Sequence, residues 1–166
     1  MHNTMSKTLI IMRHAKTEPF SDSGTDFTRQ LTEQGLQMAG KMGERLVAGG
    51  WQPQAVYCSP ATRTQQTLQA VSAHWPGTPP VIRQADAIYM ASAGDILSLI
   101  QELPEELQSV MLVGHNPAFH EVTQILSGNV LAKFSPGTIA ILQGEIPAWS
   151  EITPASLQLR DLLTPQ

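Results

Sequence analysis

Two arginines and two histidines, Arg13, His14, Arg63 and His115, are the residues whose types suggest chemistry. A guanidinium group keeps its charge at neutral pH and binds phosphate oxygens through paired N–H donors. A neutral imidazole is a nucleophile that can form a covalent bond to phosphorus. Two guanidinium groups roughly neutralise one phosphate dianion, so the set predicts a site for phosphoryl transfer that needs no metal ion.

Three short apolar runs are expected to position these residues as buried strands: residues 9–12, 55–58 and 110–113. The carboxyl ends of parallel strands share one edge of a sheet, where α/β proteins bind ligands. Side chains alternate along a strand, so Arg13 and His14 serve one site only if the first strand ends before them.

Helix signals follow the second and third of these runs. Ser59 is expected as an N-cap with Pro60 in the first helical position, which puts Arg63 in the first turns. Asn116 and Pro117 are expected to start a further helix in the same way. Helical side chains tilt toward the helix N-terminus, so Arg63 is predicted to point back at the sheet edge.

The remaining chain continues the alternation of strands and helices. One helix is expected from the N-cap Thr32 to Gly49-Gly50, and another that starts at Ser92 or Ala93 and ends at Pro104. A fourth strand is expected over residues 138–142, followed by a weakly patterned tail.

This alternation predicts an α/β fold, a three-layer α/β/α sandwich around a mostly parallel sheet. A length of 166 residues predicts a single domain, 1–166.

Composition narrows the classes of protein that fit. Apolar residues make up 42% of the chain and charged residues 14%, as in a globular protein. The net charge of −4 lacks the excess of basic residues that is typical of nucleic-acid-binding proteins, so no nucleic-acid partner is expected. One cysteine excludes an internal disulfide and a cysteine-rich zinc site. No apolar run reaches membrane-spanning length and the N-terminus has no signal-peptide core, so a cytoplasmic protein without a membrane partner is expected.

Several segments resemble the motifs of the histidine phosphatase (phosphoglycerate mutase-like) superfamily. These are the Arg-His pair within residues 9–18, the Ser-Pro-Ala-Thr-Arg segment within residues 59–67, and the Val-Gly-His-Asn-Pro segment at residues 113–117. Residues 26–35 are similar to the segment before the first helix in the superfamily's small members. The resemblance spans about residues 8–127, and the short chain matches the phosphohistidine phosphatase branch.

The resemblance implies a phosphoglycerate mutase-like fold and a phosphatase acting through a phosphohistidine intermediate. It implies His14 as the nucleophile, with Arg13, Arg63 and His115 completing the phosphate pocket and no cofactor. The implied substrate is phosphohistidine in a protein, or another phosphorylated protein or small molecule. Arg29 is a further candidate for substrate binding, with a structural ion pair as its alternative.

The chain departs from the family pattern at Met90, where larger members carry a glutamate that acts as an acid. A phosphorylated imidazole leaves more easily than an alkyl alcohol once it is protonated, so this departure favours phosphohistidine over sugar phosphates. Asp86 and Glu18 are candidate substitute acids, with solvated loop carboxylates as the favoured alternative. Two alternatives stay open: a sensor that binds phospho-ligands with little turnover, and a small-molecule phosphomonoesterase.

Cys58 lies five residues before Arg63 and suggests a cysteine phosphatase. That chemistry needs one more intervening residue and backbone N–H donors, which Pro60 lacks. Cys58 is therefore expected to be a buried strand residue.

Overall fold

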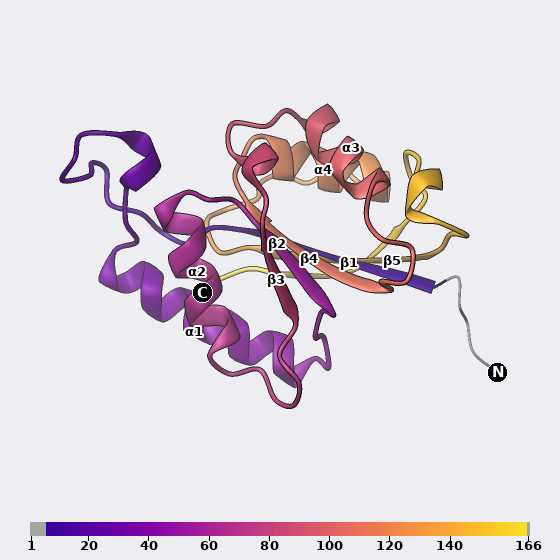
Figure 1. Cartoon of the computed structure of the whole chain (residues 1–166), viewed down its shortest axis with the longest axis horizontal. Coiled ribbons are helices and arrows are strands. Elements are labelled where there is room, and N and C mark those ends of the chain that lie inside the picture. Colours follow the sequence, from indigo (N-terminus) through magenta and orange to yellow (C-terminus); the bar gives the residue numbers. More distant parts are fainter. Residues whose placement is uncertain (1–5, 166) are drawn as a thin grey trace.

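The protein is built on one six-stranded sheet in the order β3-β2-β4-β1-β5-β6, seen in a computed structural model that describes residues 6–165 (Figure 1). The strands are β1 (Ser6–Arg13), β2 (Ala55–Cys58), β3 (Val81–Gln84), β4 (Ser109–Gly114), β5 (Ile139–Glu145) and β6 (Gln158–Leu163). The α-helices are α1 (Glu33–Ala48), α2 (Thr62–Ser72), α3 (Ala93–Gln101) and α4 (Ala118–Ser127). Three single 3-10 turns are η1 (Asp26–Thr28), η2 (Asp86–Ile88) and η3 (Trp149–Glu151).

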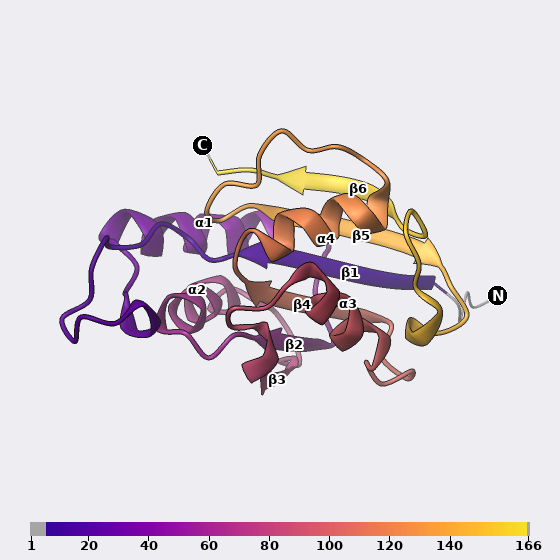
Figure 2. The ribbon, with the colours of Figure 1, turned by 90° about the horizontal axis from the view of Figure 1, so that it is seen from above.

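Five of the six strands run in one direction. β3, β2, β4 and β1 pair in parallel. β5 is antiparallel to β1, and β6 is antiparallel to β5, which returns it to the direction of β1 (Figure 2). The prediction of a mostly parallel sheet is confirmed, and the carboxyl ends of β1, β2 and β4 meet at one edge.

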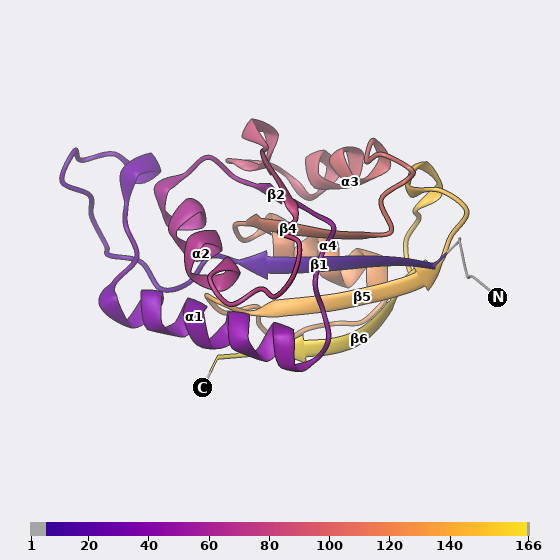
Figure 3. The ribbon, with the colours of Figure 1, turned by 60° about the horizontal axis from the view of Figure 1, so that its bottom comes forward.

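Helices cover both faces of the sheet and complete the three predicted layers. α3 and α4 lie on one face, while α1 and α2 lie side by side on the other (Figures 1 and 3). β1 alternates between them: Leu9 and Ile11 pack in the cluster with α3 and α4, and Ile10 and Met12 in the cluster with α1 and α2. This two-sided burial explains the unbroken apolar run of the first strand.

Local capping signals hold for two helices. The Thr32 hydroxyl accepts a hydrogen bond from Gly35 N at the start of α1. Ser92 and Asp95 form a reciprocal capping box at the start of α3. Both helices therefore begin where the sequence predicted.

The expected caps at Ser59 and Asn116 are wrong. α2 begins at Thr62 without a side-chain cap; the Ser59 hydroxyl accepts from Ala61 N at 3.3 Å and lies 2.7 Å from Nε2 of His115. α4 begins after Pro117, and Asn116 donates from Nδ2 to a loop carbonyl rather than capping the helix. At both positions a tertiary hydrogen bond at the sheet edge engages the side chain that the local sequence predicts as a helix cap.

Strand ends also differ from the prediction. β1 continues through Arg13, which pairs with Gly114, so the chain leaves the sheet one residue later than expected. The tail contains an additional strand, β6, along the edge of the sheet. An edge strand is buried on fewer sides, and β6 lacks the continuous apolar run that marks the central strands.

Within residues 6–165, no helix is long and apolar enough to cross a membrane.

Candidate active site

The carboxyl edge of the sheet brings the four predicted residues together. Arg13 ends β1 and His14 follows it, Arg63 lies in the first turn of α2, and His115 directly follows β4. The ring centroids of His14 and His115 are 5.5 Å apart. The side chains reach one site because parallel strands end at a common edge, as the sequence predicted.

Backbone contacts fix the position of His14 beside β4. His14 N donates to the Gly114 carbonyl at 3.0 Å, and Ala15 N donates to the Thr67 hydroxyl at 3.1 Å. A side chain at Gly114 would place its Cβ 2.4 Å from the Phe119 ring, so only glycine allows α4 to pack this closely behind the site. The sheet and α2 thus hold the loop after β1 from both sides.

The protonation of His14 follows from its surroundings. Nδ1 lies 2.8 Å from the Ala15 carbonyl oxygen, which can only accept, so Nδ1 carries the proton and Nε2 keeps its lone pair. His14 is 6% exposed. Burial, together with the charges of Arg63 and Arg13, lowers the pKa of His14 to about 4, against the opposing effect of the Ala15 hydrogen bond. Near neutral pH His14 is an uncharged nucleophile with Nε2 available.

Arg13 is held against the loop that precedes β5. Its Nη1 donates to the Phe134 carbonyl at 3.1 Å, and Asn116 Nδ2 donates to the same oxygen at 2.8 Å. Burial and the charge of Arg63 lower the pKa of Arg13. Its Nε is buried without a hydrogen-bond partner in the described chain. This leaves a fixed donor and an uncompensated charge in the site, which is the complement of an anion.

Arg63 is oriented by Asp26, a residue to which the sequence assigned no role. Nη1 of Arg63 donates to the Asp26 carbonyl at 2.9 Å and Nη2 to its Oδ2 at 3.1 Å. Tyr89 also donates to Oδ2, at 2.8 Å. Burial acts to raise the pKa of Asp26, but the hydrogen bonds from Tyr89 and Arg63 and the charge of Arg63 outweigh it and lower the pKa. Arg63 is 6% exposed, and its Nε is buried without a partner among the described residues.

Arg29 contacts the same carboxylate from the outside. Its Nε lies 3.1 Å from Oδ1 of Asp26, and its Nη1 donates to the Glu18 carbonyl at 3.3 Å. The ion-pair alternative for Arg29 is therefore present in the structure, while its contact with a substrate stays a prediction.

His115 stands opposite His14 with one ring nitrogen engaged. Nε2 lies 2.7 Å from the Ser59 hydroxyl, and Nδ1 is buried without a partner in the described chain. When Ser59 donates, Nδ1 carries the proton and is a free donor. Burial and the charges of Arg63 and His14 lower the pKa of His115 to about 3, so the ring is neutral near pH 7. The Tyr89 ring meets His115 edge-on, with centroids 5.7 Å apart.

Met90 and the two candidate acids, Asp86 and Glu18, lie in different surroundings. Met90 is 85% exposed, in a backbone conformation with φ of 59°. Asp86 accepts a hydrogen bond from Gln84, and Glu18 is exposed. The structure shows no contact between the Asp86 or Glu18 side chain and the two histidines, so the role of these carboxylates as acids stays a prediction.

Sequence reasoning missed Asp26, Tyr89 and Ser59. Asp26 lies within a segment quoted for the family resemblance, and Tyr89 precedes the conspicuous Met90. Their pairing joins residues 63 positions apart. No local pattern carries that information, because the contact exists only once η1 and Tyr89 are brought together beside Arg63.

Cys58 is the buried strand residue that the sequence predicted. Burial raises the pKa of its thiol to about 12, so it stays protonated near neutral pH. Among the described residues, no group of three or more His, Cys, Asp or Glu side chains could hold a metal ion.

Comparison with known proteins identifies the family. The model of the histidine phosphatase superfamily (branch 1) matches residues 9–88, which contain the Arg-His pair and Arg63. Over these residues the chain matches the histidine phosphatase superfamily.

Solved structures agree over nearly the whole chain. A candidate phosphohistidine phosphatase SixA from Nakamurella multipartitia is 27% identical with a TM-score of 0.82, covering 96% of both chains. One from Agrobacterium tumefaciens is 29% identical with a TM-score of 0.82, covering 96% of this chain and 98% of the other. A phosphoglycerate mutase from Plasmodium falciparum has a TM-score of 0.65 at 15% identity, covering 95% of this chain and 90% of the other, and shows the common fold. Family and structures together support phosphatase activity and the SixA-like branch.

Proposed function

We propose that the protein is a metal-independent phosphatase that forms a covalent phosphohistidine on His14 and acts on phosphohistidine in proteins. The observation that carries the proposal is a set of unpartnered donors on the residues that the sheet edge brings together with His14. Nε2 of neutral His14 is free, while Nε of Arg13, Nε of Arg63 and Nδ1 of His115 are buried without partners in the described chain. Buried donors without partners are rare, and a phosphoryl group supplies the acceptors that these three lack.

The first step transfers the phosphoryl group between two imidazoles. Nε2 of His14 forms a bond to phosphorus while the P–N bond to the substrate histidine breaks. A phosphohistidine protonated on its other ring nitrogen leaves as neutral imidazole. His14 then becomes the phosphorylated imidazolium, because its Nδ1 keeps the proton bound to the Ala15 carbonyl. Charge and protons balance without an added acid.

The second step is hydrolysis of the phosphoenzyme. Water attacks phosphorus, the bond from phosphorus to Nε2 breaks, and His14 returns to its neutral form. Both protons of the water leave with the product, which is dihydrogen phosphate. Near neutral pH this product can release one of the two protons to solvent. Arg13, Arg63 and His115 stabilise the phosphoryl oxygens in both steps, since fixed donors in a buried site act where charge shifts.

The choice of substrate rests on the leaving group. An alkyl phosphate releases a strongly basic oxygen and needs a positioned acid, whereas a protonated phosphoimidazole does not. Met90 stands where the family resemblance would place a glutamate. Its exposed thioether side chain has no proton to give to a leaving group. Similarity to candidate phosphohistidine phosphatases over nearly the whole chain supports the same substrate class. The proposal takes residues 1–166 as a single domain acting in the cytoplasm.

The test is to trap the phosphoenzyme with wild type and His14→Ala side by side. The donor is phosphoramidate, and the quench is alkaline because phosphohistidine survives base. A base-stable, acid-labile phosphoryl group on wild type alone supports the proposal. Turnover retained in His14→Ala would overturn it.

Two further outcomes separate the alternatives. Tight phosphate binding without label or turnover would indicate a phospho-ligand sensor. Faster hydrolysis of sugar or nucleotide monoesters than of a phosphohistidine peptide, in a substrate panel, would indicate a small-molecule phosphomonoesterase.

A further inference from the structure

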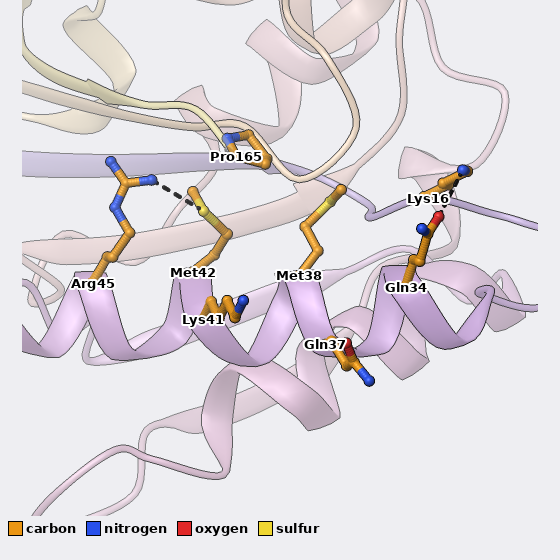
Figure 4. A pocket seen from close by; sticks show the side chains of 8 residues that line it. All are labelled: Lys16, Gln34, Gln37, Met38, Lys41, Met42, Arg45 and Pro165. Carbon is orange, nitrogen blue, oxygen red and sulfur yellow. Dashed lines mark hydrogen bonds between the residues drawn. The ribbon is translucent and has the colours of Figure 1, made fainter.

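A groove separate from the phosphate pocket lies along the side of α1. Its volume is about 810 Å³, and six of its lining residues come from α1 between Gln34 and Arg45, with Lys16 and Pro165 completing the wall (Figure 4). The α1 residues recur at spacings of three and four, so they form one stripe along the helix.

The groove carries an excess of positive charge. Lys16, Lys41 and Arg45 line it, and no carboxylate occurs among its described lining residues. This contrasts with the net charge of −4 for the whole chain. None of the three cations forms an ion pair within residues 6–165; Arg45 donates to the Thr164 carbonyl at 2.7 Å and Lys16 to the Gln34 amide at 2.9 Å. The surface is complementary to an acidic ligand.

The dimensions fit a short peptide. The twelve residues of helix from Gln34 to Arg45 span about 17 Å from first to last, the length of about five residues of extended chain. A single phosphate would leave most of this volume empty. Met38 offers an adaptable apolar contact, and Gln37 an amide that can pair with a peptide backbone.

One end of the groove adjoins the backbone of the candidate nucleophile. Gly137 N donates to the carbonyls of Arg13 and His14, at 3.1 and 2.9 Å. A Cβ on Gly137 would lie 2.7 Å from the Met38 sulfur and 3.0 Å from Pro165, so this glycine packs directly against the groove wall. A polypeptide seated in the groove therefore lies close to the strand end that presents His14.

We propose that this groove binds an acidic segment of the phosphorylated protein substrate, and so docks the substrate beside the phosphate pocket. The inference rests on the proposed function for the identity of the ligand as substrate. The binding itself depends only on the groove.

Binding is tested first with a fluorescein-labelled peptide of five glutamates, followed by fluorescence anisotropy. The groove variant is Lys41→Glu combined with Arg45→Glu. Its matched control is Arg83→Glu combined with Arg160→Glu, which changes the net charge equally at exposed positions outside the groove. The groove variant loses the ion pairs that Lys41 and Arg45 would form with the peptide. Two surface ion pairs of this kind correspond to a weakening of roughly twofold to thirtyfold in peptide affinity. Lys41→Glu alone, at an exposed position, gives a smaller weakening and keeps the test valid if the double variant does not fold.

The expected result is binding to wild type and to the control, weakened binding to the groove variants, and loss of binding as salt rises from about 0.01 M to about 1 M. Failure of wild type to bind the peptide, or equal weakening by the control variant, would overturn the proposal.

Kinetics then connect the groove to the substrate. With a phosphohistidine peptide that carries an acidic segment, the groove variant should raise KM, while its hydrolysis of phosphoramidate stays at the wild-type rate. An unchanged KM would remove the docking role. Absence of phosphoramidate hydrolysis in wild type would instead refute the proposed function, and the binding experiment would still decide whether the groove takes acidic peptide.

Discussion

The depressed pKa of His14 makes the stability of the protein depend on pH in a way that one substitution can isolate. The folded state holds His14 near a pKa of about 4, against 6.5 for a free histidine, chiefly because the ring is buried. Between these values the unfolded chain binds a proton that the folded protein does not. Stability therefore falls as the pH drops from about 6.5 toward about 4.

The magnitude follows from the two pKa values. Between pH 7 and pH 5, linkage gives a loss of about 2 kcal/mol in the free energy of unfolding from His14 alone. His115, with a pKa lowered to about 3, adds about 2 kcal/mol in the same interval. Losses of this size are a large part of the stability of a typical domain.

The assay is urea unfolding of wild type, His14→Gln and His74→Gln at pH 7 and pH 5. His14→Gln should lose about 2 kcal/mol less than wild type between the two pH values, because glutamine takes up no proton. His74 lies outside the site with a partly exposed side chain, and its substitution controls for the loss of a histidine elsewhere. An identical pH dependence in wild type and His14→Gln would refute the reasoning that burial keeps His14 neutral.

Three further predictions concern the site. Arg63→Ala should weaken inhibition by phosphate or vanadate roughly tenfold to a hundredfold, since a charge-assisted contact is worth about 1.5–3 kcal/mol; an unchanged inhibition constant would remove Arg63 from the site. Asp26→Ala should lower the rate and weaken phosphate binding while the phosphoenzyme still forms on His14, because it removes the carboxylate that accepts from Nη2 of Arg63 and leaves only the backbone carbonyl that accepts from Nη1; full activity would show that Arg63 needs no support from this carboxylate. Chelators such as EDTA should leave turnover unchanged, and a strong loss of rate restored by metal would reject the metal-independent mechanism.

Local sequence located the parts of the site that lie on strand ends. Arg13, His14 and His115 follow apolar runs, and such runs are visible in sequence because strands buried on both faces are apolar throughout. The position of Arg63 in the first turn of a helix was also predictable, although the helix starts later than its Ser-Pro signal indicates. Boundary errors of this kind arise where a tertiary hydrogen bond replaces a local cap.

The sequence by itself determined the layered α/β architecture, the shared edge at which the strands end, and the four residues brought together there. These features follow from side-chain periodicity and from the common direction of parallel strands. Tertiary structure alone decided that Asp26 and Tyr89 hold Arg63, and that basic residues of α1 line a groove closed by Pro165. Such contacts depend on how separate segments pack, because a hydrogen bond or a groove forms between surfaces that no single stretch of sequence contains.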